Sequence, residues 1–213
     1  MFITFEGSEG SGKTSQMKLL VDFLTGQGYP ILHTREPGGT LIGDQVRNVI
    51  VSLSNTGMLP RTEILLFQAS RAQLVGEVIR PFLQTGGVVL CDRYGDSTLA
   101  YQGYGYQNDL AQLRQLVEFA TGGLKPDLTL LLDVDVDEGL RRRAKSGGWN
   151  RLDAYDPEFY RRVRAGYLEM VRLEPERWIV IDANQPYDRV QQKLREVVLN
   201  RLKEAGYRPF QQA

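Results

Sequence analysis

Short apolar runs alternate along this chain with longer segments in which apolar residues recur every three or four positions. The short runs predict β-strands, and several are nearly continuous in apolar residues, as is typical of strands buried on both faces of a sheet. Alternating strands and helices predict an α/β fold with a mainly parallel sheet covered on both faces, in a single domain over residues 1–213. The predicted strands are Phe2–Phe5, Pro30–Thr34, Gly87–Cys91, Leu128–Leu132 and Trp178–Ile181.

Three predicted helices have a readable face or start. Apolar residues at spacings of three and four over residues 17–24 predict an amphipathic helix. Asp135, followed by Glu138 three positions later, predicts a capping box at the start of a second helix. Asp156 directly before Pro157 predicts an N-cap followed by proline at the first helical position of a third.

The segment between the first strand and the first helix fits the phosphate-binding pattern G-x-x-x-x-G-K-[ST]. Its glycines let the backbone turn tightly, so that successive N–H groups point at one anion next to a helix N-terminus. Lys13 is expected to meet the outer phosphates of a nucleoside triphosphate, and the Thr14 hydroxyl to ligate Mg²⁺. The residues of this P-loop are Gly7, Ser8, Glu9, Gly10, Ser11, Gly12, Lys13 and Thr14.

The composition of the chain limits its possible binding partners and cellular location. The chain has 26 basic and 26 acidic residues, so its net charge of zero gives no general attraction to nucleic acid or to a membrane surface. A single cysteine, Cys91, allows no internal disulfide. No apolar run approaches the roughly 18 residues that cross a bilayer, and the N-terminal residues do not resemble a signal peptide. We expect a cytoplasmic protein that binds neither nucleic acid nor membranes.

A P-loop alone does not distinguish a kinase from a switch protein. The sequence lacks the N-K-x-D motif of a GTPase, although Asp92-Arg93-Tyr94-Gly95 formally matches the D-x-x-G of a switch loop. Arg93 suits a static phosphate clamp better than a switch. Asp92 ends an apolar strand, so its carboxylate is expected at the sheet edge beside Mg²⁺. It could also cap a helix, and the two roles do not exclude each other.

Two other arginines occur in unusual settings. Arg35 follows the second predicted strand in a loop that proline and glycine residues constrain, at the edge where open α/β sheets bind ligands, although a loop arginine is more often simply solvated. Arg71 shares a helical face with Phe67 and further apolar residues. An arginine in an apolar stripe either reaches the surface or meets a buried partner. A planar ligand that stacks on Phe67 and accepts a hydrogen bond from Arg71 would give both side chains a partner. Phe67 taken alone is more simply interpreted as a core residue.

A basic cluster follows in the second half of the chain. Residues 141–164 contain eight basic side chains and three acidic ones. Such a run is usually a solvated face, but this one flanks two glycines, so residues from about 141 to 153 are a candidate mobile lid. A donor cradle, an acceptor clamp of Arg93 and Arg35, and a basic lid together indicate phosphoryl transfer between two phosphates, which needs positioning and charge neutralisation but no side-chain nucleophile.

Seven motifs in this order resemble those of bacterial thymidylate kinases, from Met1 to about Leu202. They are Phe5-Glu6-Gly7-Ser8-Glu9-Gly10-Ser11-Gly12-Lys13-Thr14, Thr34-Arg35-Glu36-Pro37-Gly38-Gly39-Thr40, Leu66-Phe67-Gln68-Ala69-Ser70-Arg71, Asp92-Arg93-Tyr94, Ser97-Thr98-Leu99-Ala100-Tyr101-Gln102-Gly103, Pro126-Asp127-Leu128-Thr129-Leu130 and Ile181-Asp182-Ala183. The resemblance implies a three-layer P-loop kinase fold with a five-stranded parallel sheet and a short basic lid, usually paired into a homodimer. It implies the reaction of ATP with dTMP to give ADP and dTDP, with Mg²⁺.

The same resemblance implies roles for individual residues. Phe67 would stack on thymine, and Arg71, Thr98 and Gln102 would read its edge. Tyr101 would lie against the sugar, Arg35 and Arg93 would hold the acceptor phosphate, and Glu9 would face the acceptor sugar or the metal, which Thr14 and Asp92 would also ligate. The segment from Ala183 to Pro186, including Gln185, would border adenine. Lys13, Glu9, Arg93, Arg142 and Arg151 would form the catalytic set.

The lid departs from the family pattern. Two positions that often carry arginine are Ala144 and Ser146 here, with Arg143 and Lys145 displaced by one residue, which turns a helical side chain by about 100°. A kinase for another small nucleotide or nucleoside is the alternative function within the same class. A nucleotide-dependent switch or binding module is the alternative from another class.

Overall fold

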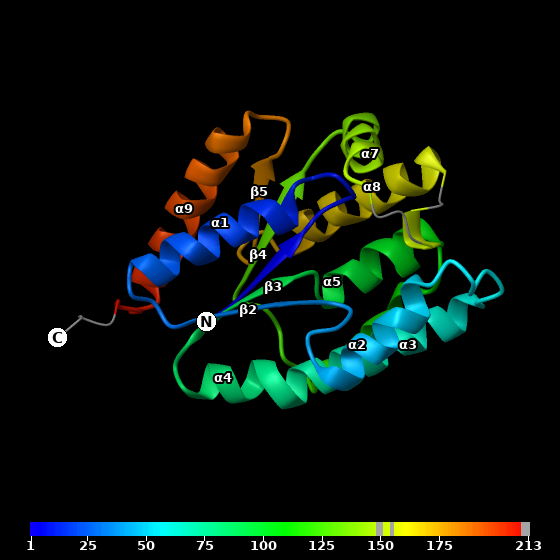
Figure 1. The fold of residues 1–213 in the computed structure, drawn as a ribbon, viewed down its shortest axis with the longest axis horizontal. Coiled ribbons are helices and arrows are strands. Elements are labelled where there is room, and N and C mark those ends of the chain that lie inside the picture. Colours follow the sequence, from blue (N-terminus) through cyan, green and yellow to red (C-terminus); the bar gives the residue numbers. More distant parts are fainter. Residues whose placement is uncertain (148–150, 154–155, 210–213) are drawn as a thin grey trace.

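A five-stranded parallel sheet forms the centre of the protein (Figure 1). The structure is a computed structural model of the 213-residue chain, and it describes residues 1–147, 151–153 and 156–209. The strand order is β2-β3-β1-β4-β5, and every neighbouring pair is parallel. The strands are β1 (Phe2–Glu6), β2 (Ile31–Arg35), β3 (Val88–Asp92), β4 (Leu128–Asp133) and β5 (Trp178–Asp182).

Helices cover both faces of the sheet, which confirms the predicted three-layer α/β class. In Figure 1, α2, α3 and α4 run along the lower edge of the molecule. None of the described helices is long and apolar enough to cross a membrane. They are α1 (Lys13–Gly26), α2 (Leu41–Val51), α3 (Pro60–Leu74), the π-helix η1 (Val75–Ile79), α4 (Arg80–Gln84), α5 (Gly95–Thr98), the π-helix η2 (Leu99–Gly105), α6 (Leu110–Thr121), α7 (Val136–Lys145), the 3₁₀-helix η3 (Arg151–Asp153), α8 (Pro157–Leu173) and α9 (Tyr187–Glu204).

Alternation along the strands divides the core between the two faces. On β1, Ile3 and Phe5 pack with α1 and α9, whereas Phe2 points to the opposite face and packs with residues of α3 and η1. On β4, Leu130 joins the first cluster, and Leu131 packs against α8. Successive side chains of a strand point to opposite faces, so nearly continuous apolar strands supply both cores at once.

Each predicted strand is present, but the structure extends every strand at its C-terminal end, by one residue that is charged. These end residues are Glu6, Arg35, Asp92, Asp133 and Asp182. Because all five strands are parallel, these charged residues lie along the same edge of the sheet. The apolar pattern ended before them, since a charged side chain at a strand end faces the ligand-binding edge rather than the core.

The two predicted helix starts have different outcomes. Asp156 caps α8 as predicted, because its carboxylate accepts a bond from the Phe159 backbone N–H at 2.8 Å. The predicted capping box at Asp135 is wrong, since this N-cap residue makes no side-chain cap bond. Its carboxylate accepts instead from Arg164 at 3.0 Å, and Glu138 pairs with two arginines of α7. Arginine side chains therefore bind both carboxylates in place of the backbone N–H groups at the helix start.

A buried ion pair joins α5 to the start of β5. The Arg177 guanidinium donates to both carboxylate oxygens of Asp96, at 2.6 and 3.1 Å, and to the Thr129 hydroxyl. The Asp96 side chain is 9 % exposed and that of Arg177 14 %. Removal of one partner from such a pair leaves the other charge buried without compensation.

We predict that Arg177→Met lowers the free energy of unfolding by about 3–5 kcal/mol, because Asp96 then stays buried and unpaired. Urea denaturation followed by circular dichroism measures this. The matched control is Arg172→Met, which breaks the exposed pair with Glu169 on α8 and should change stability little. Equal effects of the two substitutions would contradict the assignment.

Candidate active site

The P-loop is held against α7 by a close backbone approach. Gly10 has a φ of +69°, and a Cβ on it would lie 2.0 Å from the Gly139 carbonyl oxygen. A Cβ on Gly139 would in turn lie 2.6 Å from the Glu9 carbonyl oxygen. The two glycines therefore let the loop and the first half of α7 pack directly together.

Lys13 lies at the centre of the loop and is almost buried. Its ammonium group donates to the Gly7 and Ser8 carbonyl oxygens, both at 2.9 Å, and to the Ser11 hydroxyl. Burial, together with the nearby Arg93, lowers the pKa of Lys13 to about 8. Lys13 is thus a preorganised cation with three donors that a phosphate can take over from the loop.

Thr14 and Asp92 come together at the mouth of the loop. The Thr14 hydroxyl donates to Asp92 Oδ2 at 2.5 Å. A hydroxyl and a carboxylate are hard oxygen donors of the kind that Mg²⁺ prefers, and Mg²⁺ usually takes one or two protein ligands with the rest from phosphates and water. No group of three or more His, Cys, Asp or Glu residues in the described parts of the chain could hold a metal alone. The donor set therefore fits Mg²⁺ bound together with phosphates.

Arg93 is clamped from several sides. It has a φ of +69°, one of two non-glycine residues in the left-handed region among those described. Its guanidinium donates to Glu9 at 2.8 Å and to the Tyr101 hydroxyl at 3.0 Å, and it lies 4.8 Å from the centre of the Tyr101 ring. Tyr101 donates to the other oxygen of Glu9 at 2.5 Å. Burial raises the pKa of Tyr101 well above its usual value, so its hydroxyl remains a donor.

Glu6 is a residue of this site that the sequence did not reveal. It ends β1, is fully buried, and accepts from the Tyr94 N–H at 2.8 Å, the Ser97 hydroxyl at 2.6 Å and the Tyr167 hydroxyl at 2.7 Å. Arg93 donates to Ser97 at 3.2 Å, so Glu6 supports the guanidinium through a hydroxyl. The sequence-level signal was a carboxylate at the end of a strand that is otherwise apolar.

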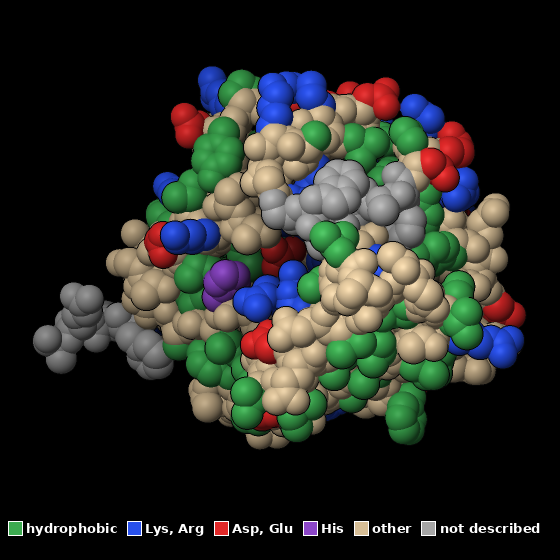
Figure 2. All heavy atoms as spheres, turned by 45° about the vertical axis from the view of Figure 1, so that its right-hand side comes forward, with side chains coloured by type: hydrophobic (Ala, Val, Ile, Leu, Met, Phe, Trp, Pro, Cys, Tyr) green, Lys and Arg blue, Asp and Glu red, His purple; other side chains and the backbone are tan. Residues whose placement is uncertain are grey.

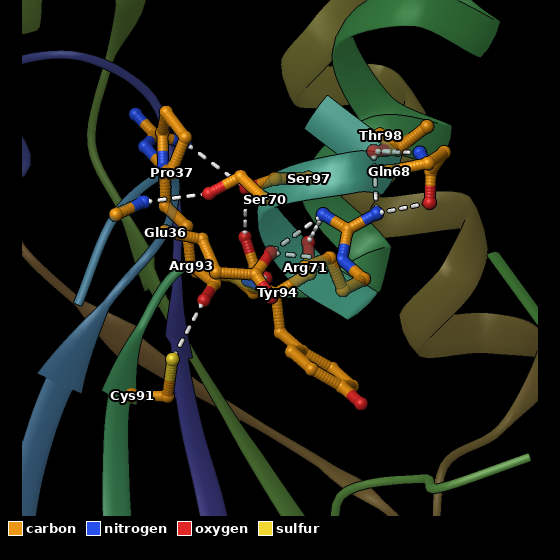
Figure 3. A network of polar contacts seen from close by, with 12 residues as sticks. Glu36, Pro37, Gln68, Ser70, Arg71, Cys91, Arg93, Tyr94, Ser97 and Thr98 are labelled. Carbon is orange, nitrogen blue, oxygen red and sulfur yellow. Dashed lines mark hydrogen bonds and ion pairs between the residues drawn. The ribbon is translucent and has the colours of Figure 1, made fainter. Parts of the chain in front are cut away.

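Arg71 lies in a second polar network, which Figure 3 shows at close range. It is 1 % exposed, and its buried partner is Glu36, which accepts at 2.8 and 2.6 Å. The remaining N–H groups donate to Gln68 at 2.8 Å, to Thr98 at 3.0 Å and to the Tyr94 carbonyl at 3.0 Å. All five donors of Arg71 are therefore used within the protein.

One cavity of about 1180 Å³ is lined by the P-loop and by Arg71, Arg93 and Tyr101. Figure 2 shows basic side chains gathered beside the hollow on this face of the molecule. Its lining includes Phe67, which is half-buried on α3, and Arg35, whose guanidinium is 3.3 Å from Asp44. Arg47 on α2 also lines it, and no motif had pointed to that residue. The cavity lining includes every site residue predicted from the sequence except Gly7, Ser8 and Arg151.

The two predicted catalytic arginines of the lid, Arg142 and Arg151, bind different parts of the protein. Arg142 donates to the Ala183 carbonyl at 2.9 Å, next to Gln185, so it lies at the predicted adenine border. Arg151 instead donates to Glu63 at 2.5 Å and to the Ile50 carbonyl at 2.8 Å. Arg143 also lines the cavity. Residues 148–150 of the predicted lid lie outside the described residues.

We predict a pH-dependent stability effect at Glu6. Burial and the neighbouring Asp96 raise the pKa of Glu6 to about 7, against the opposing effect of Arg93, Ser97 and Tyr167. Between pH 4.5 and 7 the folded state therefore binds more protons than the unfolded state, and stability falls as pH rises, by roughly 1.4 kcal/mol per pH unit.

Glu6→Gln removes this titration, so the stability of the native protein relative to the variant should decline from pH 5 to pH 8. Urea denaturation of both proteins at the two pH values measures the difference. A difference that stays the same at both values would show that Glu6 is already charged at pH 5 in the folded protein.

Comparison with known proteins identifies the family. A family model described as thymidylate kinase matches residues 5–194. A thymidylate kinase of Roseiflexus sp. (strain RS-1) is 50 % identical over 210 residues, covering 93 % of each chain, and one of Deinococcus radiodurans is 48 % identical over 201 residues, covering 94 % of this chain and 97 % of the relative. The crystal structure of thymidylate kinase from Ehrlichia chaffeensis superposes with a TM-score of 0.76 at 36 % identity, covering 93 % of this chain and 98 % of the other. The chain belongs to the thymidylate kinase family.

Proposed function

We propose that this protein transfers the γ-phosphoryl group of ATP to dTMP, producing ADP and dTDP. The observation that carries the proposal is the continuity of the cavity, which is lined at one side by the P-loop and at the other by Phe67, Thr98 and Gln102, with Arg93 also in its lining. A switch protein needs a triphosphate site but no second pocket of this kind.

The donor nucleotide takes the P-loop side. The loop N–H groups and Lys13 bind the β- and γ-phosphates, and Ala183, Gln185 and Arg142 border the adenine. Thr14 and Asp92 would hold Mg²⁺, which would neutralise negative charge on the phosphates. Glu9 is paired with Arg93, so its contact with the metal or the acceptor sugar stays a prediction.

The acceptor nucleotide takes the other side. Phe67 stacks on the base, Tyr101 lies against the sugar, and Arg35 and Arg93 bind the monophosphate. Thr98 Oγ1 accepts from both Gln68 and Arg71, so both of its lone pairs are used and its hydrogen is left for donation to a base oxygen. Because Arg71 has no unused donor, any contact with the base shares an N–H with a protein acceptor.

The reaction then needs no side-chain nucleophile. An oxygen of the acceptor phosphate attacks the γ-phosphorus, and the bond from that phosphorus to the β–γ bridging oxygen breaks. Arg93 keeps two negatively charged phosphates close, and Lys13 stabilises the charge that develops at the transferring group. Positioning and charge neutralisation account for the chemistry.

An acceptor panel tests the proposal. ADP release should be fastest with dTMP when dTMP, dUMP, dCMP and thymidine are compared under ATP and Mg²⁺. A higher rate with dCMP or thymidine would identify a kinase for another nucleotide or nucleoside. Tight ATP binding without any ADP release would favour a switch or binding module.

We predict that Lys13→Ala abolishes phosphoryl transfer while the fold survives, because within the described residues the ammonium group bonds to the P-loop and not to the core. Coupled ADP-release assays and thermal unfolding measure the two properties. Lys193→Ala is the matched control, since Lys193 is exposed on α9 and pairs with Glu196 on the surface. Loss of cooperative unfolding in the Lys13 variant would contradict the assignment.

We further propose a cytoplasmic homodimer. The helices α2, α3 and α6 pack next to one another and carry large apolar side chains that are exposed in the single chain. A contiguous exposed apolar surface is characteristic of an interface, and identical chains pair most simply through one surface about a two-fold axis. These side chains are Leu41, Ile42, Val49, Leu65 and Phe119.

Leu65→Glu combined with Phe119→Glu should therefore convert a dimer into a monomer, because it places charge on the exposed apolar side chains of α3 and α6. Sedimentation equilibrium of both proteins measures the mass. Leu173→Glu on α8, outside this surface and also exposed, should leave the dimer intact. A native protein that sediments as one chain would overturn the proposal.

A further inference from the structure

We propose that Glu63 is a positioning residue that determines acceptor specificity, because it fixes the side-chain amide of Gln102 with its oxygen available to the bound base. The inference rests on the proposed function, since it concerns the acceptor half of the same cavity. It assigns a role to a buried carboxylate that does not itself line the cavity.

In the hydrogen bond between Gln102 and Glu63, only Gln102 can be the donor. Gln102 Nε2 donates to Glu63 Oε1 at 2.9 Å, and the residues are 4 % and 2 % exposed. A carboxylate accepts hydrogen bonds and does not donate them, so the amide nitrogen of Gln102 must face Glu63. The amide oxygen then lies on the other side of the group. No donor among the residues that the structure describes bonds to this oxygen, and Gln102 lines the cavity beside Phe67 and Thr98.

Arg151 completes the arrangement. Its Nη2 donates to Glu63 Oε2 at 2.5 Å, so the two oxygens of Glu63 bind one partner each. Arg151 Nε is fixed in turn by the Ile50 carbonyl at the end of α2, at 2.8 Å. The guanidinium offsets the cost of burying the carboxylate charge, and its bond prevents the carboxylate from rotating. The segment that contains Arg151 is thereby joined to the residue that reads the base.

A fixed amide oxygen selects one kind of pyrimidine edge. The ring of thymine carries an N–H between two carbonyl groups, whereas the corresponding ring nitrogen of cytosine has a lone pair and no hydrogen. Gln102 Oε1 accepts from the first and opposes the second. A glutamine that turns freely would offer its NH₂ group to cytosine equally well, so the discrimination depends on Glu63.

Glu63→Gln tests this role, because it keeps the shape of the side chain but lets either end of the amide face Gln102. We expect the KM for dTMP to rise about tenfold, the loss of roughly one good hydrogen bond, while the KM for ATP changes less than twofold. The ratio of kcat/KM for dTMP to that for dCMP should fall by a similar factor. Glu63→Asp retains an acceptor-only group and should restore part of the ratio.

Glu77→Gln is the matched control. Gln73 Nε2 donates to Glu77 Oε2 at 2.7 Å, so the same kind of amide–carboxylate pair occurs on the outer surface, away from the cavity. This variant should have native kinetics. Thermal unfolding shows whether each variant is folded. If Glu63→Gln is not, Glu63→Asp is compared instead; its shorter side chain draws the acceptor away from Gln102, so the same changes should appear to a smaller extent.

A double-mutant cycle with Gln102→Leu separates positioning from general destabilisation. If Glu63 acts through Gln102, the double variant should discriminate dTMP from dCMP no worse than Gln102→Leu alone. Additive losses, or an unchanged ratio in folded Glu63→Gln, would overturn the positioning role. A native protein that does not phosphorylate dTMP would instead overturn the proposed function.

Discussion

Burial of carboxylates beside arginines is the constraint on which the acceptor half of the site depends. Glu36 holds Arg71, Glu63 holds Arg151, and Glu9 holds Arg93. Each pair joins segments that are distant in the sequence, and the Glu36–Arg71 pair fixes α3 to the end of β2. A buried charge without its partner is costly, and each arginine is therefore confined to a narrow range of positions before any ligand arrives.

These pairs hold the arginines in place before a ligand binds, but they also neutralise much of the positive charge that would attract it. Arg93 is at once a predicted ligand of the acceptor phosphate and the partner of Glu9 and Tyr101. An incoming phosphate must share or replace these bonds, so its net gain is smaller than the gross attraction to a guanidinium. In return, little side-chain ordering is required on binding, because the guanidinium is already held by its protein partners. Glu6 provides the support beneath, through Ser97 and Tyr167.

Local patterns predicted the parts of the molecule that depend on local interactions. Strand positions followed from apolar runs, the P-loop from its spacing, and the cap at Asp156 from a neighbouring proline. The apolar stripe around Arg71 left open whether the side chain reaches the surface or meets a buried partner, and in the structure it meets Glu36. The sequence could not identify that partner, because it lies 35 residues away and is chosen by the packing of α3 against the end of β2.

The same reason explains why the sequence did not reveal Glu6 and Glu63. Glu6 binds Tyr94 and Ser97, which are 88 and 91 residues away in the sequence. Glu63 binds Gln102 and Arg151, which are 39 and 88 residues away. A carboxylate at a strand end or on a helix is usually solvated, so only tertiary contacts distinguish these two. The capping box failed for the converse reason, because distant Arg164 competed for Asp135.

The basic segment illustrates how such pairs bear on catalysis. Arg142 and Arg143 of α7 line the cavity, whereas Arg151 is held by Glu63 of α3 and by the Ile50 carbonyl of α2. A direct role of Arg151 at the phosphates would require it to leave a carboxylate that is 2 % exposed, and burial makes that separation costly. Cations on α7 need no such step, since Gly10 and Gly139 already bring that helix against the P-loop. We therefore propose that Arg143, rather than Arg142 at the predicted adenine border, is the α7 arginine that approaches the transferring phosphate, while Arg151 stays between Glu63 and the end of α2.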